Sequence, residues 1–320
     1  MKSFWSALVH HLQHGHHVFL ALVAEHTQGS PGTTGAKLFM SESGEVVGTI
    51  GGGIMEYTLV ERVRQILQQK DFQPEIQTLY HRASGPGEKS GMICAGSQTN
   101  LYYLCRPQIE RLPLEKAVSI IEKDLAGVLS ISPSEISVAE TSLIAAKPVI
   151  QLTQTKGKWV YTQQLLNRRR IAILGGGHCA LALSRVMHQL DYTVQVFETR
   201  PEVATITQNT YARSVQVVED YQMAGSLIRF PELTCAVVMT TDFPSDVRAL
   251  LGLVSLPLPF IGVMGSAAKI AKIFEQLHQA GVTAKALERL YAPVGLPIGS
   301  HTPEEIAISV AAQILRERRR

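Results

Sequence analysis

The sequence predicts an α/β protein with two parts: a mixed α+β domain over residues 1–167, then a doubly wound parallel-sheet domain over residues 168–320. The chain of 320 residues is longer than one typical domain, and 45% of its residues are hydrophobic, which is enough to form two cores. Near residue 167 the pattern changes to short apolar strands that alternate with helical stretches. Such uninterrupted apolar runs are typical of parallel strands covered on both faces.

The N-terminal part mixes helices and strands. The elements expected there, in chain order, are a helix from about residue 3, strands over 17–25, 36–40 and 45–50, a helix over 54–69, a strand over 97–105 and a helix over 114–124. A glycine-rich loop over 28–35 separates the first two strands. Residues 127–163 alternate short apolar runs with turn-forming residues, which predicts strands that complete this domain.

In the C-terminal part, predicted strands alternate with predicted helices. Its expected strands are 171–174, 193–198, 214–218, 236–241 and 259–264. Near the end of the chain, Thr302-Pro303-Glu304-Glu305 predicts the start of a helix, because threonine caps a helix and proline and acids suit its first turn.

The loop after the first of these strands carries the pattern G-x-G-x-x-A at residues 175–180. A tight turn needs Gly175, a phosphate can approach the backbone at Gly177, and Ala180 lets the next helix pack close to the strand. Glu198 ends the following strand, where an acid accepts hydrogen bonds from a ribose diol. This context predicts a Rossmann-like domain that binds NAD(P) or another nucleotide. A domain that keeps the turn only for packing is the alternative.

Three further residues belong to the expected nucleotide site. His178 stands at the mouth of the loop, where it either contacts ligand phosphate or caps the helix, and the sequence leaves both open. Ser266 and Lys269 follow the last of the five strands. Ligands of open α/β sheets gather at the carboxyl ends of the strands, so both residues are expected near Gly175.

A second glycine loop lies in the first domain. Gly51, Gly52 and Gly53 join a strand to a helix, so their amides and the helix dipole can bind an anion. Glu56 lies in the first turn of that helix, where it either contacts a ligand or only complements the dipole.

The four cysteines are scattered without a C-x-x-C pair, which argues against a disulfide framework and an all-cysteine zinc site. Cys94 lies among small residues in S-G-M-I-C-A-G (90–96), which leave room for a ligand to reach its sulfur. An inert buried cysteine is the alternative there. Cys105, Cys179 and Cys235 lie in or beside apolar elements and are expected to act as packing residues.

The composition of the chain limits the kinds of partner that we expect it to bind. Net charge is only +3, and the basic runs at 168–170 and 316–320 are not interleaved with aromatic residues, so we do not expect a nucleic-acid surface. The sequence shows neither a long apolar run nor a secretory signal, so we expect a cytoplasmic protein without membrane contact. His10 and His14 have a spacing that can chelate a metal, although a solvated helix end is the simpler interpretation.

Eight motifs, spread in order over nearly the whole chain, resemble the XdhC/CoxI family of xanthine dehydrogenase accessory proteins. They are S-P-G-T-T-G-A-K (30–37), G-T-I-G-G-G-I-M-E (48–56), S-G-M-I-C-A-G (90–96), I-L-G-G-G-H (173–178), E-T-R-P (198–201), I-G-V-M-G-S-A-A-K (261–269), A-P-V-G-L-P-I-G-S (292–300) and T-P-E-E-I-A-I-S (302–309). The chain departs from the family pattern at Ala95, where glycine is usual, and at Glu198, where aspartate is common.

The resemblance implies a non-catalytic maturation factor, without catalytic residues, that binds the molybdenum cofactor (molybdopterin). It would deliver the cofactor to an apo molybdenum hydroxylase of the xanthine or carbon-monoxide dehydrogenase type. Cys94 and the first-domain loops would hold the cofactor, with Cys94 as the metal ligand. A cofactor sulfurase and a second copy of the chain are further candidate partners. An NAD(P)-dependent oxidoreductase, with His178 as the sequence-adjacent proton-transfer candidate, is the competing class, and a scaffold without ligand is the third.

Overall fold

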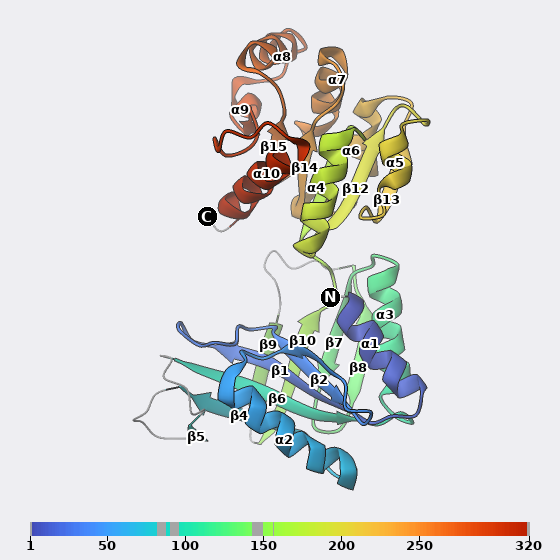
Figure 1. Cartoon of the computed structure of the whole chain (residues 1–320), viewed down its shortest axis with the longest axis vertical. Helices are drawn as coiled ribbons and strands as arrows, with labels where there is room; N and C mark the ends of the chain where they lie inside the picture. Colours follow the sequence, from blue (N-terminus) through green and yellow to red (C-terminus); the bar gives the residue numbers. More distant parts are fainter. Residues whose placement is uncertain (1, 82–87, 90–95, 143–149, 156, 319–320) are drawn as a thin grey trace. The chain divides into compact units, whose positions relative to one another are not determined.

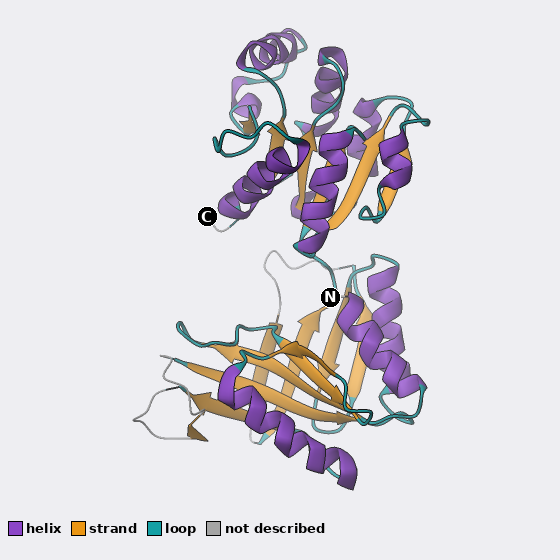
Figure 2. Ribbon diagram, viewed as in Figure 1, coloured by secondary structure: helices purple, strands orange, loops and turns teal. Residues whose placement is uncertain are grey.

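The structure is a computed structural model that describes residues 2–81, 88–89, 96–142, 150–155 and 157–318 (Figure 1). The chain divides into two compact units, an N-terminal unit over Met1–Leu166 and a C-terminal unit over Asn167–Arg320. The N-terminal unit contains antiparallel sheets and the C-terminal unit a parallel sheet with helices, so the predicted α/β fold class is confirmed (Figure 2).

Two sheets make up the N-terminal unit. The larger has the strand order β3-β2-β1-β6-β4-β5, and the smaller β8-β7-β10-β9. The strands are β1 Val18–His26, β2 Lys37–Ser41, β3 Val46–Thr49, β4 Glu75–Tyr80, β5 Glu88–Lys89, β6 Ser97–Cys105, β7 Gly127–Ile131, β8 Ile136–Glu140, β9 Ile150–Thr155 and β10 Lys158–Gln164, and the helices are α1 Lys2–Gln13, α2 Gly53–Gln69 and α3 Arg111–Glu122. All pairings are antiparallel except that of β4 with β5.

Both faces of β1 are buried, which explains its unbroken apolar sequence. Residues such as Val18 and Leu20 face a core shared with α1, α3 and the smaller sheet. Their neighbours Phe19 and Ala21 face a second core shared with α2. Because side chains alternate along a strand, one strand separates the two cores.

The C-terminal unit is a six-stranded parallel sheet with the order β13-β12-β11-β14-β15-β16. Its strands are β11 Arg170–Leu174, β12 Thr193–Glu198, β13 Ser214–Val217, β14 Thr234–Val238, β15 Phe260–Val263 and β16 Leu290–Tyr291. The helices are α4 His178–Gln189, α5 Ala204–Gln208, α6 Ala224–Leu227, α7 Phe243–Leu253, α8 Ala267–Gln279, α9 Ala284–Leu287 and α10 Pro303–Glu317, with 3-10 turns η1 Tyr221–Met223 and η2 Pro231–Leu233.

Helices cover both faces of this parallel sheet (Figure 2). Ile171 and Ile173 of β11 pack with α4 and α10, whereas Ala172 and Leu174 belong to the core that contains α7 and α8. From the central strand β11 the chain builds outward to β13, then crosses back to β14. The direction of winding therefore reverses between β11 and β14, and in open α/β sheets ligands bind beside the carboxyl ends of such strands.

All five strands predicted for this unit are present, and β16 was missed. A strand of two residues carries too little apolar pattern to be recognised. The predicted helix start at Thr302 is confirmed, because Thr302 and Glu305 form a reciprocal capping box. In the described part of the chain, no helix combines the length and apolarity needed to cross a membrane.

Candidate functional site

Loops that are distant in sequence touch one another in the N-terminal unit. A Cβ added to Gly32 would lie 2.2 Å from the carbonyl oxygen of Ile50, and one on Gly51 would lie 2.7 Å from the amide nitrogen of Gly32. A Cβ on Gly96 would lie 2.8 Å from the carbonyl oxygen of Gln28. These backbones approach too closely for any side chain, so glycine is required at each position. We call loops 27–36 and 50–52 together with Gly96 the loop cluster.

Gln98 ties the loop cluster together and is 1% exposed. Its Oε1 accepts hydrogen bonds from the Gly32 amide and the Ser30 hydroxyl, both at 3.1 Å. Its Nε2 donates to the Ile50 carbonyl at 3.0 Å and to Asn100 at 2.9 Å. One buried amide side chain thus satisfies polar groups from three segments.

His81 is a second buried polar residue that contacts the loop cluster. Its Nε2 lies 3.2 Å from the Ser30 hydroxyl, and its amide donates to the Gly96 carbonyl at 3.0 Å. Burial lowers the pKa of His81, which favours the neutral imidazole at neutral pH. Neither His81 nor Gln98 was among the predicted site residues, although a glutamine and an asparagine inside an otherwise apolar strand were a usable signal.

Glu56 occupies the anion position that the second glycine loop was predicted to offer. One of its oxygens accepts hydrogen bonds from the Thr49 hydroxyl at 2.7 Å and from the amides of Ile50 and Gly52 at 3.0 Å. Gly51 and Gly52 have φ values of +129° and +70°, a backbone region that favours glycine. The structure therefore brings Glu56 and the loop together, with the carboxylate of the chain itself bound to the amides.

Cys94 lies outside the described residues, and its role stays a prediction. Its neighbour Gly96 belongs to the loop cluster. As predicted for packing residues, Cys105 and Cys235 are buried, and burial raises the pKa of both thiols, that of Cys235 to about 11. Cys179 is half-buried, and burial raises its pKa as well.

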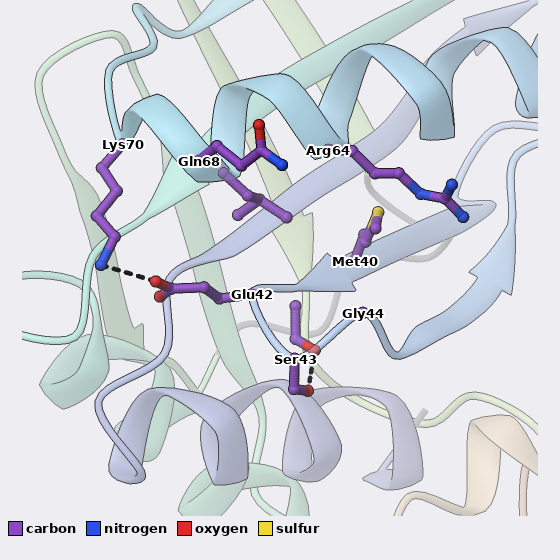
Figure 3. Close-up of a pocket in the computed structure, with 9 residues that line it drawn as sticks. Met40, Glu42, Ser43, Gly44, Arg64, Gln68 and Lys70 are labelled. Carbon is purple, nitrogen blue, oxygen red and sulfur yellow. Dashed lines mark hydrogen bonds and ion pairs between the residues drawn. The ribbon is translucent and has the colours of Figure 1, made fainter.

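A cavity of about 330 Å³ lies elsewhere in the N-terminal unit, between the β2–β3 turn and the last turns of α2 (Figure 3). At its edge Glu42 is 2.7 Å from Lys70 and accepts the backbone amide of His17 at 3.0 Å. These contacts, that of Lys70 first, lower the pKa of Glu42 to about 2. No predicted site residue lines this cavity. Its lining residues are Met40, Ser41, Glu42, Ser43, Gly44, Arg64, Leu67, Gln68 and Lys70.

The glycine loop of the C-terminal unit follows β11. Gly175 has φ +112°, and a Cβ there would lie 2.4 Å from the Met239 carbonyl oxygen. A Cβ on Gly177 would meet nothing within 4 Å, so a ligand can approach the backbone at that residue. His178 is exposed at the first position of α4, and Ala180 is buried against the sheet. The loop thus has one face fixed by packing and one face open.

Glu198 lies beneath this loop and is 0% exposed. Its Oε2 accepts hydrogen bonds from the Gly176 amide at 2.8 Å and from Arg200 Nη2 at 2.9 Å. Its Oε1 accepts from Arg200 Nε at 3.0 Å, Tyr221 Oη at 2.9 Å and the Thr199 amide at 2.8 Å. Burial alone would raise the pKa of Glu198, but the hydrogen bonds outweigh it and hold the pKa at about 2. Glu198 is therefore an anion whose two oxygens are already bound within the chain.

Lys269 and Ser266 lie at the carboxyl end of β15. Ser266 caps α8 by accepting the Lys269 amide at 3.3 Å, and the Lys269 ammonium pairs with the fully buried Asp246. Asp246 also accepts the Thr240 hydroxyl at 2.6 Å, and burial raises its pKa although Lys269 acts in the opposite direction. The Cα of Thr240 would lie 3.0 Å from a Cβ on Gly175. The Lys269 contacts therefore extend to a residue beside the glycine loop.

A cavity of about 290 Å³ lies beside the first half of α4. It is lined by His178, Leu181, Ala182, Arg185, Gln208, Tyr211, Pro303 and Glu304. Within the described ranges, no three His, Cys, Asp or Glu side chains are placed to hold a metal ion together.

These observations define a two-domain protein whose C-terminal half is a Rossmann domain. Residues 171–314 match the family model of the XdhC Rossmann domain, and residues 11–79 match the model of the XdhC and CoxI family. The chain belongs to the XdhC and CoxI family, as its motifs predicted.

Relatives support this assignment. The chain is 24% identical over 290 residues to the uncharacterized protein YqeB of Escherichia coli K12, a match that covers 91% of this chain and 42% of that protein. It is 29% identical over 163 residues to a Bacillus subtilis 168 protein named as a probable xanthine dehydrogenase subunit, covering 50% of this chain and 46% of that protein. The matches thus span less than half the length of these curated relatives.

A solved structure shares the fold across the whole chain. The crystal structure described as a xanthine dehydrogenase from Bacillus halodurans aligns with a TM-score of 0.73 at 20% identity, and the match covers 98% of this chain and 95% of that one.

Proposed function

We propose that this protein is an accessory factor of a xanthine-dehydrogenase-type molybdenum hydroxylase, which binds the molybdenum cofactor and delivers it to the apoenzyme. The loop cluster carries this proposal, because it joins three of the family motifs around Gln98 in one place. Family membership and the name of the Bacillus subtilis relative support a partner of the xanthine dehydrogenase class.

The donor groups of the N-terminal unit fit such a cofactor. Molybdopterin is an anionic pterin phosphate with sulfur ligands to its metal, so it suits amide-rich loops and an accessible thiolate. The amides of the 50–52 loop already bind one oxyanion, the carboxylate of Glu56. In the proposed complex these amides would hold the phosphate, His81 and Ser30 would offer further polar contacts, and Cys94 would ligate the metal.

The delivery role predicts a large change in the recipient enzyme. When the gene for this protein is deleted, the hydroxylase should still be synthesised, but most of it should lack molybdenum. Metal analysis of the purified hydroxylase, with and without co-expression of this protein, measures the difference. Unchanged molybdenum content would refute delivery.

Cys94→Ser is expected to weaken cofactor retention while leaving folding intact. Structural metal–thiolate sites are worth several kcal/mol, so affinity should fall by more than about tenfold. The measurement is molybdopterin retained after gel filtration, with the melting temperature as a folding control. Cys105→Ser is the matched control because Cys105 is buried in β6. Equal retention by the wild type and both variants would exclude Cys94 as a ligand.

We further propose that the C-terminal unit binds NAD(P) or a related nucleotide where Gly177 faces open space. If this site served an oxidoreductase, the protein would change nicotinamide absorbance in the presence of alcohols or aldehydes. A panel of such substrates distinguishes this competing class from an accessory factor that binds nucleotide without turnover.

A further inference from the structure

The carboxyl edge of β12 presents a cation to solvent instead of the expected carboxylate. A residue that recognises a ribose diol needs free carboxylate lone pairs. Glu198 is 0% exposed, and both its oxygens accept hydrogen bonds within the chain. The Arg200 side chain, two residues further on, is 47% exposed.

From this arrangement we infer that the C-terminal unit selects a nucleotide with a phosphorylated ribose, of the NADP class, and that Arg200 binds the additional phosphate. The inference rests on the proposed nucleotide binding by this unit. It is independent of molybdenum cofactor binding by the N-terminal unit.

Glu198 holds the Arg200 guanidinium in a fixed orientation. Nε and Nη2 lie 3.0 and 2.9 Å from its two oxygens, which is a bidentate contact. A guanidinium carries five N–H donors, so this contact leaves donors for a second anion. Because Glu198 is itself fixed by the Gly176 amide, ordering Arg200 for a ligand costs little further side-chain entropy.

The charged groups nearest to this ion pair are Asp242 and Lys269. The pKa of Arg200 is raised, first by Glu198 and in smaller part by Asp242. Asp242 caps α7 by accepting the Ser245 amide at 2.8 Å, and its pKa is lowered first by that bond and in smaller part by Lys269. Arg200 and Lys269 therefore both act on Asp242, while their paired acids are fully buried. Arg200 is the more exposed of the two cations, and a ribose phosphate gains from its guanidinium, whereas a neutral diol does not.

Calorimetry on the full chain tests this with two pairs of probes, NADP+ against NAD+ and 2′,5′-ADP against 5′-AMP. The members of each pair differ only by the 2′-phosphate. A charge-assisted hydrogen bond contributes about 1.5–3 kcal/mol, so the phosphorylated member should bind at least about tenfold more tightly. The preference should shrink as salt rises, because exposed charges are screened.

Arg200→Gln should abolish the preference. Arg316→Gln is the matched control, because Arg316 is 50% exposed, also pairs with a carboxylate and lies at the end of α10; it should retain the preference. Since Arg200→Gln leaves Glu198 without its counter-charge, the double variant Glu198→Gln/Arg200→Gln removes both charges. The double variant should also lose the preference. Its melting temperature shows whether it is folded.

Three results would overturn the inference. If all four probes bind without preference, this inference is wrong, but the proposed nucleotide binding still stands. A preference that survives in folded Arg200→Gln removes the role of Arg200. No binding of any probe overturns the nucleotide site and this inference together, while molybdopterin retention by the same preparation still tests the delivery role separately.

Discussion

Gly175→Ala is expected to lower the free energy of unfolding of the C-terminal unit by about 3 kcal/mol or more. The backbone at Gly175 has φ +112°, which side chains rarely tolerate, and the added methyl group would lie 2.4 Å from the Met239 carbonyl oxygen. Gly175 and Met239 directly follow the adjacent strands β11 and β14, so neither backbone can move without disturbing the sheet. The midpoint of thermal unfolding should fall by roughly 10 °C.

Gly177 provides the matched comparison two residues along the same loop. Its φ is −74°, and a Cβ there meets nothing within 4 Å, so Gly177→Val should cost at most about 1 kcal/mol as a poorer helix cap. The branched side chain should instead block the approach of a nucleotide phosphate. If calorimetry finds wild type and Gly177→Val equally unable to bind any nucleotide, the loop serves packing alone. A Gly175→Ala protein of wild-type stability would contradict the loop geometry.

Glu198→Gln is expected to cost about 3 kcal/mol at neutral pH, because it removes the charge of a fully buried carboxylate that pairs with Arg200 and places amide hydrogens against donors. The pKa of Glu198 falls from its ordinary 4.5 to about 2 on folding. Since the folded pKa is the lower one, the stabilisation is complete above pH 4.5 and is lost as pH falls towards 2. The difference in unfolding free energy between wild type and variant should therefore shrink over this range.

Urea unfolding at pH 7, 4 and 3 measures this difference. Glu275→Gln is the control, because Glu275 is exposed on α8 and its replacement should change stability by no more than about 0.5 kcal/mol. A Glu198→Gln variant with wild-type stability at pH 7 would show that the ion pair does not stabilise the fold.

The strands with complete burial were predicted from sequence, and so were β3 and β13, which contain no buried residue. Every residue of β11 is buried, so its apolar run marked a central strand. In contrast, β4 was not predicted, because Leu79 is the one buried residue among its six and its sequence is mostly polar. A strand at such a position depends on its pairing with β6, which one segment of sequence does not reveal.

Residues of the candidate sites could be predicted where the local backbone conformation restricts which residue type can occupy a position. The tight turn at Gly175 and the open approach at Gly177 follow from spacing alone. The contacts of Glu198 could not be predicted in this way. Spacing shows that an acid ends a strand, but it does not show that Arg200 folds back onto that acid. Likewise, Gln98 joins two loops that lie 66 and 48 residues away in sequence, so its role is visible only in the folded chain.

The amides of the first-domain glycine loop bind the Glu56 carboxylate before any ligand arrives. An anionic ligand that binds these amides must displace the Glu56 carboxylate. Its net affinity is therefore the difference between two similar interactions. When the ligand leaves, the Glu56 carboxylate binds the amides again, so no backbone donor is left unpaired. Such competition lowers the net affinity of the ligand, and among related complexes a lower affinity is mostly a faster dissociation.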